Sequence, residues 1–224
     1  MRHVSSLWFP VIVLVGLIGT KVLAWSSLAR VRRSIQNFEN PQFTSFEFSE
    51  LPAWVRRRFE RLHAAFTGLG FRELVIYKRR SDRLIYTCLL VAADGLTIVH
   101  LWVARSFGAH RLTSLLAGWP AFKRELAVAP RYSLVTEFSE VRRFDTTMVE
   151  FLARSHVDGK LEFLIVPPEM PLPEVIERHR AGARAFAAKI GAAPLPITSA
   201  NEFFACERAH MARMAKTLRQ RLGG

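Results

Sequence analysis

The sequence is poor in the residues and patterns that mark familiar catalytic sites. It contains two cysteines, Cys88 and Cys206, which are too few for a disulfide scaffold and are typical of a reducing compartment. The hydrolase pattern GxSxG, the phosphate-binding P-loop, the dinucleotide pattern GxGxxG and the zinc pattern HExxH are absent from all 224 residues. Their absence argues against a familiar hydrolase, NTPase or dehydrogenase.

Acidic residues are scarce as well. The chain has 19 Asp and Glu against 32 Lys and Arg, which gives a formal net charge of +13. A basic segment beside a membrane is attracted to anionic headgroups by up to about 1 kcal/mol per Lys or Arg, so we expect membrane lipid as a partner. Nucleic acid is not expected, because no helix-turn-helix, zinc-finger spacing or glycine-aromatic RNA pattern accompanies the charge. The excess of arginine over lysine, with abundant alanine, indicates a GC-rich bacterial source.

Charge is nearly missing from residues 7–25, where Lys21 is the one ionisable side chain. A helix over this stretch would be about 28 Å long, close to the roughly 30 Å hydrocarbon core of a bilayer. Trp8 and Trp25 flank the apolar run, where aromatic rings favour the membrane interface, and Lys21 can extend its ammonium group to that interface. We therefore predict a transmembrane anchor with these three residues at its ends.

The charges on either side of the anchor predict its orientation. The segment before it carries a single arginine, whereas the segment after it carries three and no nearby acid: Arg30, Arg32 and Arg33. By the positive-inside rule, we expect the N-terminus outside and the main domain in the cytoplasm, at a bacterial inner membrane. The alternative is a cleaved signal peptide, with residues 7–20 as its hydrophobic region and cleavage before Trp25.

Small residues form a stripe along the predicted anchor. Gly16, Thr20 and Ala24 are spaced four apart, and such spacing lets another helix approach closely. We expect a helix-helix contact here, made either with a second copy or with other membrane protein subunits.

The rest of the chain predicts an α+β fold. We expect an anchor at residues 1–25, a basic stalk and linker at 26–49, and one soluble domain at 50–224, in which two antiparallel meanders of about six strands pack with about four helices. Apolar periodicity and turn residues place helices at residues 52–69, 111–127, 174–190 and from Ser199 onward, and strands at residues 71–79, 84–92, 96–104, 132–138, 144–152 and 161–166. The similar order of elements in the two halves suggests a duplication, although no repeat of residues supports it.

The first predicted helix carries a cluster of arginines: Arg56, Arg57, Arg58 and Arg61. Its apolar residues recur at three- and four-residue steps, so the arginines point away from that face. They form either a solvated helix face or, together with the arginines behind the anchor, a surface that docks onto anionic lipid or a partner.

Histidines are the first candidates for catalysis. His100 lies mid-strand in TIVHLW, as a buried core histidine would; the alternative is a base in a pocket that also holds Thr136. Other polar residues that could line a pocket flank the predicted turn: Asp145, Thr146 and Thr147. His179 shares no helix face with the acids before it, and Cys206 with His210 supplies two ligands where a metal site needs more. We predict no catalytic, cofactor-binding or metal-binding residue.

These observations favour a single-pass, membrane-anchored and non-catalytic accessory subunit of a larger membrane complex, docking through its anchor and its basic cytoplasmic domain. A membrane-tethered ligand-binding or catalytic domain, with a pocket between sheet and helices, is the alternative. A third hypothesis is an electrostatic binder of lipid or nucleic acid, for which steep salt dependence is expected.

Overall fold

The computed structural model describes residues 36, 39–79, 85–104, 132–148 and 160–223. The chain divides into two compact units, one of residues 41–210 and the other of residues 1–40 with 211–224. In the second unit, Arg219 forms an ion pair with Glu39, with an Nη2 to Oε1 distance of 2.6 Å. The first unit holds the sheet and all the sites described below.

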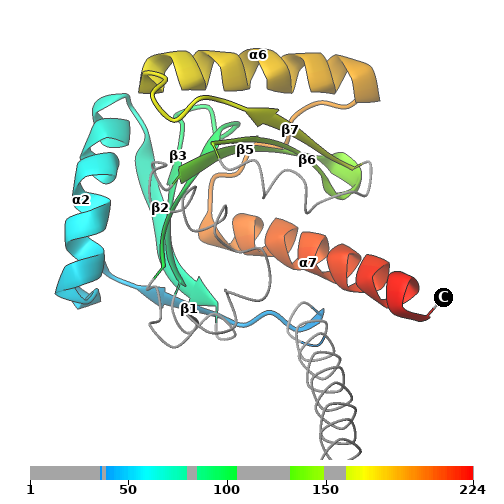
Figure 1. Ribbon diagram of the computed structural model, residues 1–224, viewed down its shortest axis with the longest axis horizontal. Coiled ribbons are helices and arrows are strands. Elements are labelled where there is room, and N and C mark those ends of the chain that lie inside the picture. Colours follow the sequence, from blue (N-terminus) through cyan, green and yellow to red (C-terminus); the bar gives the residue numbers. More distant parts are fainter. Residues whose placement is uncertain (1–35, 37–38, 80–84, 105–131, 149–159, 224) are drawn as a thin grey trace, which may run out of the picture. The chain divides into compact units, whose positions relative to one another are not determined.

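Seven strands of the described chain form one mixed sheet, in which they lie side by side in sequence order (Figure 1). The strands are β1 (Phe43–Phe46), β2 (Arg72–Arg79), β3 (Ile85–Val91), β4 (Ile98–Ala104), β5 (Tyr132–Phe138), β6 (Arg142–Thr147) and β7 (Leu161–Ile165). Neighbouring strands are antiparallel except β6 and β7, which are parallel.

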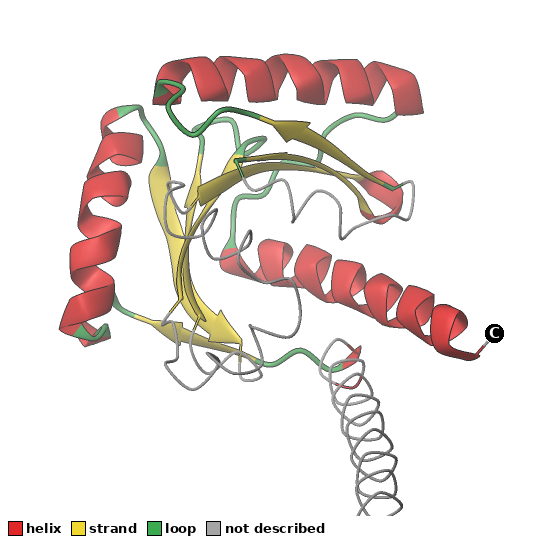
Figure 2. Cartoon of the chain, viewed as in Figure 1, coloured by secondary structure: helices red, strands yellow, loops and turns green. Residues whose placement is uncertain are grey.

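The described helices are α2 (Ala53–Gly68), α6 (Leu172–Ile190) and α7 (Ala200–Gly223), with short 3-10 turns η1 (Phe48–Glu50) and η3 (Ser139–Val141) (Figure 2). All three helices were predicted from the sequence, and the residues at their ends show which local signals mark the boundaries. The helix α6 stops where Gly191 adopts a left-handed φ of 63°, a conformation that glycine enters without strain. At the start of α7, Ser199 accepts a hydrogen bond from the Glu202 amide while the Glu202 carboxylate accepts one from the Ser199 amide, the expected capping box.

The helices cover both faces of the sheet. Figure 1 shows α2 and α6 on one face and the first turns of α7 on the other. Consecutive residues of β3 follow this division: Leu90 packs in the core beneath α2 and α6, whereas Leu89 packs with Phe203 of α7. Both leucines are fully buried, so β3 is covered on both faces.

The structure confirms the α+β class but corrects the arrangement of the strands. One continuous sheet replaces two separate meanders, and the segment taken as linker contributes β1, which pairs with β2. The final strand, β7, is parallel to β6 rather than antiparallel. Residues 148–160 separate these two strands, a length typical of the crossover that a parallel pair requires.

The predicted anchor at residues 7–25 and the predicted helix at 111–127 lie outside the described residues. Among the helices that are described, none combines the length and the apolar character that a membrane crossing requires.

Candidate functional site

A group of buried charged side chains lies on the face of the sheet that α7 covers. Glu137 on β5 stands directly opposite Arg143 on β6, and α7 contributes Glu207 and His210, which are three residues apart and so share one helix face. The exposed fractions of these side chains are 1% for Glu137, 11% for Arg143, 14% for Glu207 and 5% for His210. We call these four residues the Arg143 cluster.

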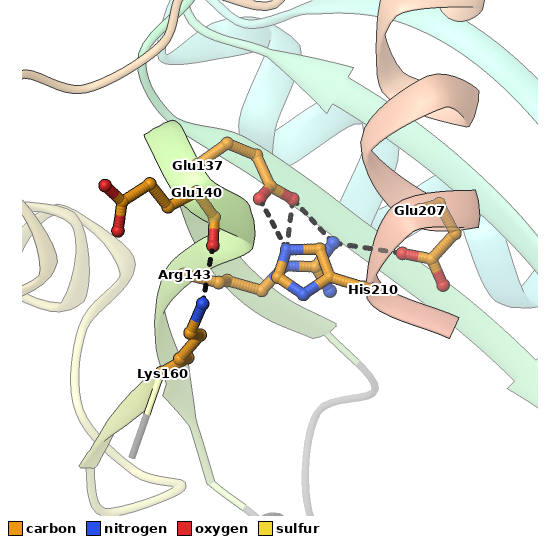
Figure 3. Close-up of polar contacts among 6 residues, drawn as sticks. All are labelled: Glu137, Glu140, Arg143, Lys160, Glu207 and His210. Atoms are coloured by element: carbon orange, nitrogen blue, oxygen red, sulfur yellow. Dashed lines mark hydrogen bonds and ion pairs between the residues drawn. The ribbon is translucent and has the colours of Figure 1, made fainter. Parts of the chain in front are cut away.

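Each charge in the Arg143 cluster has a partner (Figure 3). Arg143 donates to Oε1 of Glu137 through both Nε, at 2.8 Å, and Nη2, at 2.5 Å, and the same Nη2 donates to Oε2 of Glu207 at 3.0 Å. The second oxygen of Glu137 lies 2.9 Å from Nε2 of His210. Because Glu137 is ionised, this nitrogen is the donor, and both oxygens of the carboxylate are engaged.

The pKa values follow from this pairing. Burial alone would raise the pKa of Glu137, but the charge of Arg143 and the hydrogen bonds from His210 and Arg143 outweigh it and lower the pKa to about 2. Burial would lower the pKa of Arg143, yet the nearby carboxylates, Glu137 foremost, hold it well above its usual value. Burial and the charge of Arg143 together lower the pKa of His210. At neutral pH the cluster therefore holds one cation, two carboxylates and a neutral histidine.

A strained turn holds the register that brings Glu137 opposite Arg143. Glu140 and Val141, between β5 and β6, have φ values of 57° and 58°, which are unfavourable for non-glycine residues and most of all for a β-branched one. Lys160 donates to the Glu140 carbonyl at 3.4 Å (Figure 3), and Arg142 donates to the exposed Glu140 carboxylate at 2.7 Å.

Two further polar groups lie on the same sheet face as the cluster. His100 on β4 and Asp145 on β6 are partly exposed as residues, but Nε2 of His100 and Oδ1 of Asp145 are fully covered and have no hydrogen-bond partner among the described residues. Burial, with the charge of Arg143, lowers the pKa of His100 to about 4. Burial raises the pKa of Asp145 to about 7 despite the opposing effect of Arg143. The ring of His100 packs edge-on against Phe203 of α7, with centroids 5.3 Å apart.

The opposite face holds a neutral buried histidine. His179 of α6 lies 2.9 Å from the hydroxyl of Thr136 and 2.8 Å from that of Thr146. Thr136 donates its own proton to the carbonyl of Leu96 at 3.0 Å, so it must accept from Nε2–H of His179, and Nδ1 then accepts from Thr146. Burial lowers the pKa of His179 to about 3. Because Thr136 and His100 lie on opposite faces, they do not share the pocket imagined for them.

A third polar group combines three metal-ligand types. His63 of α2, Glu73 of β2 and Cys88 of β3 each offer a ligand atom, and these atoms lie within 4.8 Å of one another. Oε2 of Glu73 is 2.9 Å from Nε2 of His63 and 3.9 Å from the sulfur of Cys88.

Most of the residues singled out from the sequence lie outside the described part of the chain: Trp8, Gly16, Thr20, Lys21, Ala24, Trp25, Arg30, Arg32 and Arg33. The structure does place the other three on α2, where Arg57 and Arg58 are exposed and Arg56 is partly exposed. His210, considered with Cys206 as a metal ligand, instead binds Glu137 through Nε2.

Sequence reasoning missed the Arg143 cluster and the His63, Glu73 and Cys88 group. The members of each come from elements far apart in the chain, and no fixed spacing relates a strand residue to a helix residue across a core. A charged residue between apolar neighbours, such as Glu137 in VTEF, was the available indication of a buried charge.

Comparison of the chain with protein-family models, with curated proteins and with solved structures found no match. Its function must therefore be argued from its own residues.

Proposed function

We propose that the protein is a single-pass, membrane-anchored accessory subunit that docks without catalysis onto an anionic surface of a larger membrane complex at the bacterial inner membrane. Anionic headgroups beside the complex would add to the attraction. The observation that carries this proposal is the arginine face of α2, defined here as Arg57, Arg58 and Arg61.

The arginine face lies opposite the buried face of α2. Val55, Phe59 and Phe66 are buried in the core, whereas the three arginines are exposed. Arg61 follows Arg58 by three residues and Arg57 by four, so it neighbours both on the helix surface. In the described part of the chain, no ion pair to a carboxylate is made by any of the three. Nε of Arg57 donates to the Ala53 carbonyl at 3.4 Å. Within the described residues the three guanidinium groups have no carboxylate partner, so they can supply the bidentate donors that recognise carboxylates or phosphates.

The buried charges support docking rather than catalysis. In the Arg143 cluster the guanidinium is divided between two carboxylates, and Glu137 accepts on both oxygens. Groups engaged in this way hold β5, β6 and the start of α7 together, and none is poised to attack a substrate.

Purification of the full-length protein in mild detergent tests the proposal. We expect the wild type to retain a stoichiometric partner, and a variant with Arg57, Arg58 and Arg61 changed to Gln to lose it. The matched control removes three charges from α6 by changing Arg178, Arg180 and Arg184 to Gln. Arg178 and Arg180 already pair with acids of their own helix, and Arg184 is exposed. Recovery of the wild type as a lone monomer, or equal losses from both variants, would refute docking through α2.

A reporter fused after Gly224 tests the orientation. The proposal requires the reporter to remain on the cytoplasmic side and the mature protein to retain residues 7–25. Export of the reporter, or a mature N-terminus at Trp25, would overturn the assigned address.

His100 and Asp145 favour a second candidate, a ligand-binding or catalytic domain. Two covered polar atoms without partners among the described residues are costly unless a ligand or water satisfies them. A thermal-shift screen with small polar molecules tests this candidate. A compound that stabilises the wild type and not a His100→Phe variant would support it, and equal stabilisation of both would count against this site.

A further inference from the structure

The His63, Glu73 and Cys88 group lies away from both the arginine face and the Arg143 cluster, and docking does not use it. Its members come from a helix and two adjacent strands, all within the unit of residues 41–210. His63 lies on α2 one turn before its end, with its ring 5.8 Å from that of Phe48. Cys88 is completely buried in the core beneath α2.

An irregularity in β2 turns Glu73 toward this face. In regular pairing, Glu73 would share a face with Val75 and Tyr77. Glu73 pairs with Leu90 of β3 and Val75 pairs with the next residue, Leu89. Two steps along β2 therefore match one step along β3, and the register shifts by one residue. Leu74 and Val75 consequently both pack in the core beneath α7, and Glu73 reaches the other face, where it contacts His63 and Cys88. Bulges of this kind commonly redirect a side chain beside a functional site.

The three ligand types suit zinc. Zn²⁺ binds thiolate sulfur at about 2.3 Å, and imidazole nitrogen and carboxylate oxygen at about 2.0–2.2 Å, so tetrahedral ligands stand roughly 3.3–3.7 Å apart. The separations of 2.9 Å and 3.9 Å from Glu73 to the other two atoms differ from these values by about 0.4 Å. The nitrogen of His63 and the sulfur of Cys88 lie within 4.8 Å of each other. Magnesium and calcium are disfavoured, since they prefer all-oxygen shells.

Exposure also suits a metal with one open coordination position. The side chains of His63 and Glu73 are 25% and 35% exposed, which leaves water a path to the site, whereas the sulfur of Cys88 lies on the protein side. Three protein ligands with a fourth position facing solvent form the arrangement of open zinc sites.

We propose that His63, Glu73 and Cys88 bind one Zn²⁺ ion through Nε2, a carboxylate oxygen and the thiolate sulfur, with water as the fourth ligand. Binding replaces the S–H bond of Cys88 with an S–Zn bond, and the proton passes to solvent. No electron transfer is involved. The ion would tie α2 to β2 and β3.

Zinc titration of the metal-free, full-length protein, followed by native mass spectrometry, tests the proposal. We expect one Zn²⁺ per chain, and we expect His63→Gln, Glu73→Gln and Cys88→Ala to weaken binding by more than the roughly 10- to 100-fold that loss of an outer-shell partner costs. Cys206→Ala is the matched control and should bind as the wild type does. Replacement of zinc by Co²⁺ should produce a sulfur-to-metal absorption band. This band should be lost in Cys88→Ala and kept in Cys206→Ala.

Two results would overturn the zinc site: no binding by the wild type, or binding that survives unchanged in either Glu73→Gln or Cys88→Ala. The latter would place the metal elsewhere in the chain and leave the group as a hydrogen-bonded pair beside a core thiol. Should Cys88→Ala not fold, Glu73→Gln still decides the question, because its side chain is more than one-third exposed. Docking through α2 is measured separately with the arginine variants, so either proposal can fail alone.

Discussion

Replacement of Arg143 by Met tests whether the Arg143 cluster holds the fold together. Methionine fills similar volume without charge, so the change leaves the Glu137 and Glu207 carboxylates facing each other without their cation. Removing one partner of a buried ion pair costs about 3–5 kcal/mol, and the 1% exposure of the Glu137 side chain places this site in the buried class. We expect Arg143→Met to lower the free energy of unfolding by about that amount.

Arg142→Met is the matched control, one residue earlier on the same strand. Its partner Glu140 is 65% exposed and the Arg142 side chain 27% exposed, so water screens their interaction. Arg142 also donates to the Ile190 carbonyl at 3.3 Å, and the two losses together should cost about 1–2 kcal/mol. Urea unfolding of the full-length variants in mild detergent, followed by circular dichroism, measures both. Arg143→Lys, which keeps the charge but loses the fork of donors, should lie between them.

The pH dependence separates charge from packing. In the wild type, the pKa of Glu137 is about 2, below its ordinary value of 4.5, so its contribution is complete above about pH 4.5 and is lost as the pH falls toward 2. Without Arg143, burial raises that pKa, and acid then relieves the variant by protonating the carboxylate. The difference in the free energy of unfolding between Arg143→Met and the wild type should therefore decrease as the pH is lowered from 7. The argument would be refuted if this difference did not change with pH, or if it were no larger than the difference between Arg142→Met and the wild type.

Three further predictions concern two titratable side chains, Asp145 and His179, and one closely packed glycine, Gly182. Asp145→Asn should stabilise the protein above pH 7 by at most about 4 kcal/mol and should have no effect below pH 4. The reason is that the pKa of Asp145 is about 7 in the folded protein, against an ordinary value of 3.8, so the wild type loses stability as the pH rises from about 4 to 7. Unfolding measured at a series of pH values tests this. NMR titration should find that His179 stays neutral as the pH is lowered, down to its pKa of about 3. The unfolded chain takes up this proton at a higher pH, so stability falls as the pH drops below about 6.5. A protonation midpoint near pH 6 would contradict the burial argument. Gly182→Ala should lower the free energy of unfolding by about 1–2 kcal/mol, because the added methyl group meets the Phe144 ring, with Cε1 at 2.9 Å. Gly68 has open space around it, so Gly68→Ala should raise the free energy of unfolding by up to about 1 kcal/mol. Equal effects of the two alanine variants would refute the packing explanation.

The elements themselves were largely readable from local patterns. The apolar stripe at three- and four-residue steps predicted α2, and Gly191 and the Ser199-Glu202 capping box marked the ends of α6 and the start of α7. These features act within one or two turns of the chain, so they are visible in the order of residues.

The arrangement of strands was less readable because pairing joins distant residues. The Phe43–Phe46 segment reads as linker because four residues give too few alternations, and it becomes a strand only because the edge of β2 is available. The parallel pairing of β6 with β7 depends on the path between them, which no local turn pattern specifies.

The order of residues alone determined the charge of +13, the positions of the helices and the arginine face of α2, because these depend on composition and on spacing within a single element. Tertiary packing alone decided which charges are buried together. Arg143 meets Glu207, and Glu137 meets His210, only when α7 packs against the sheet. Glu73 meets Cys88 only through a one-residue irregularity in β2. A slip of one residue in a strand exchanges its two faces, so the partners of a buried charge are set by register rather than by local sequence.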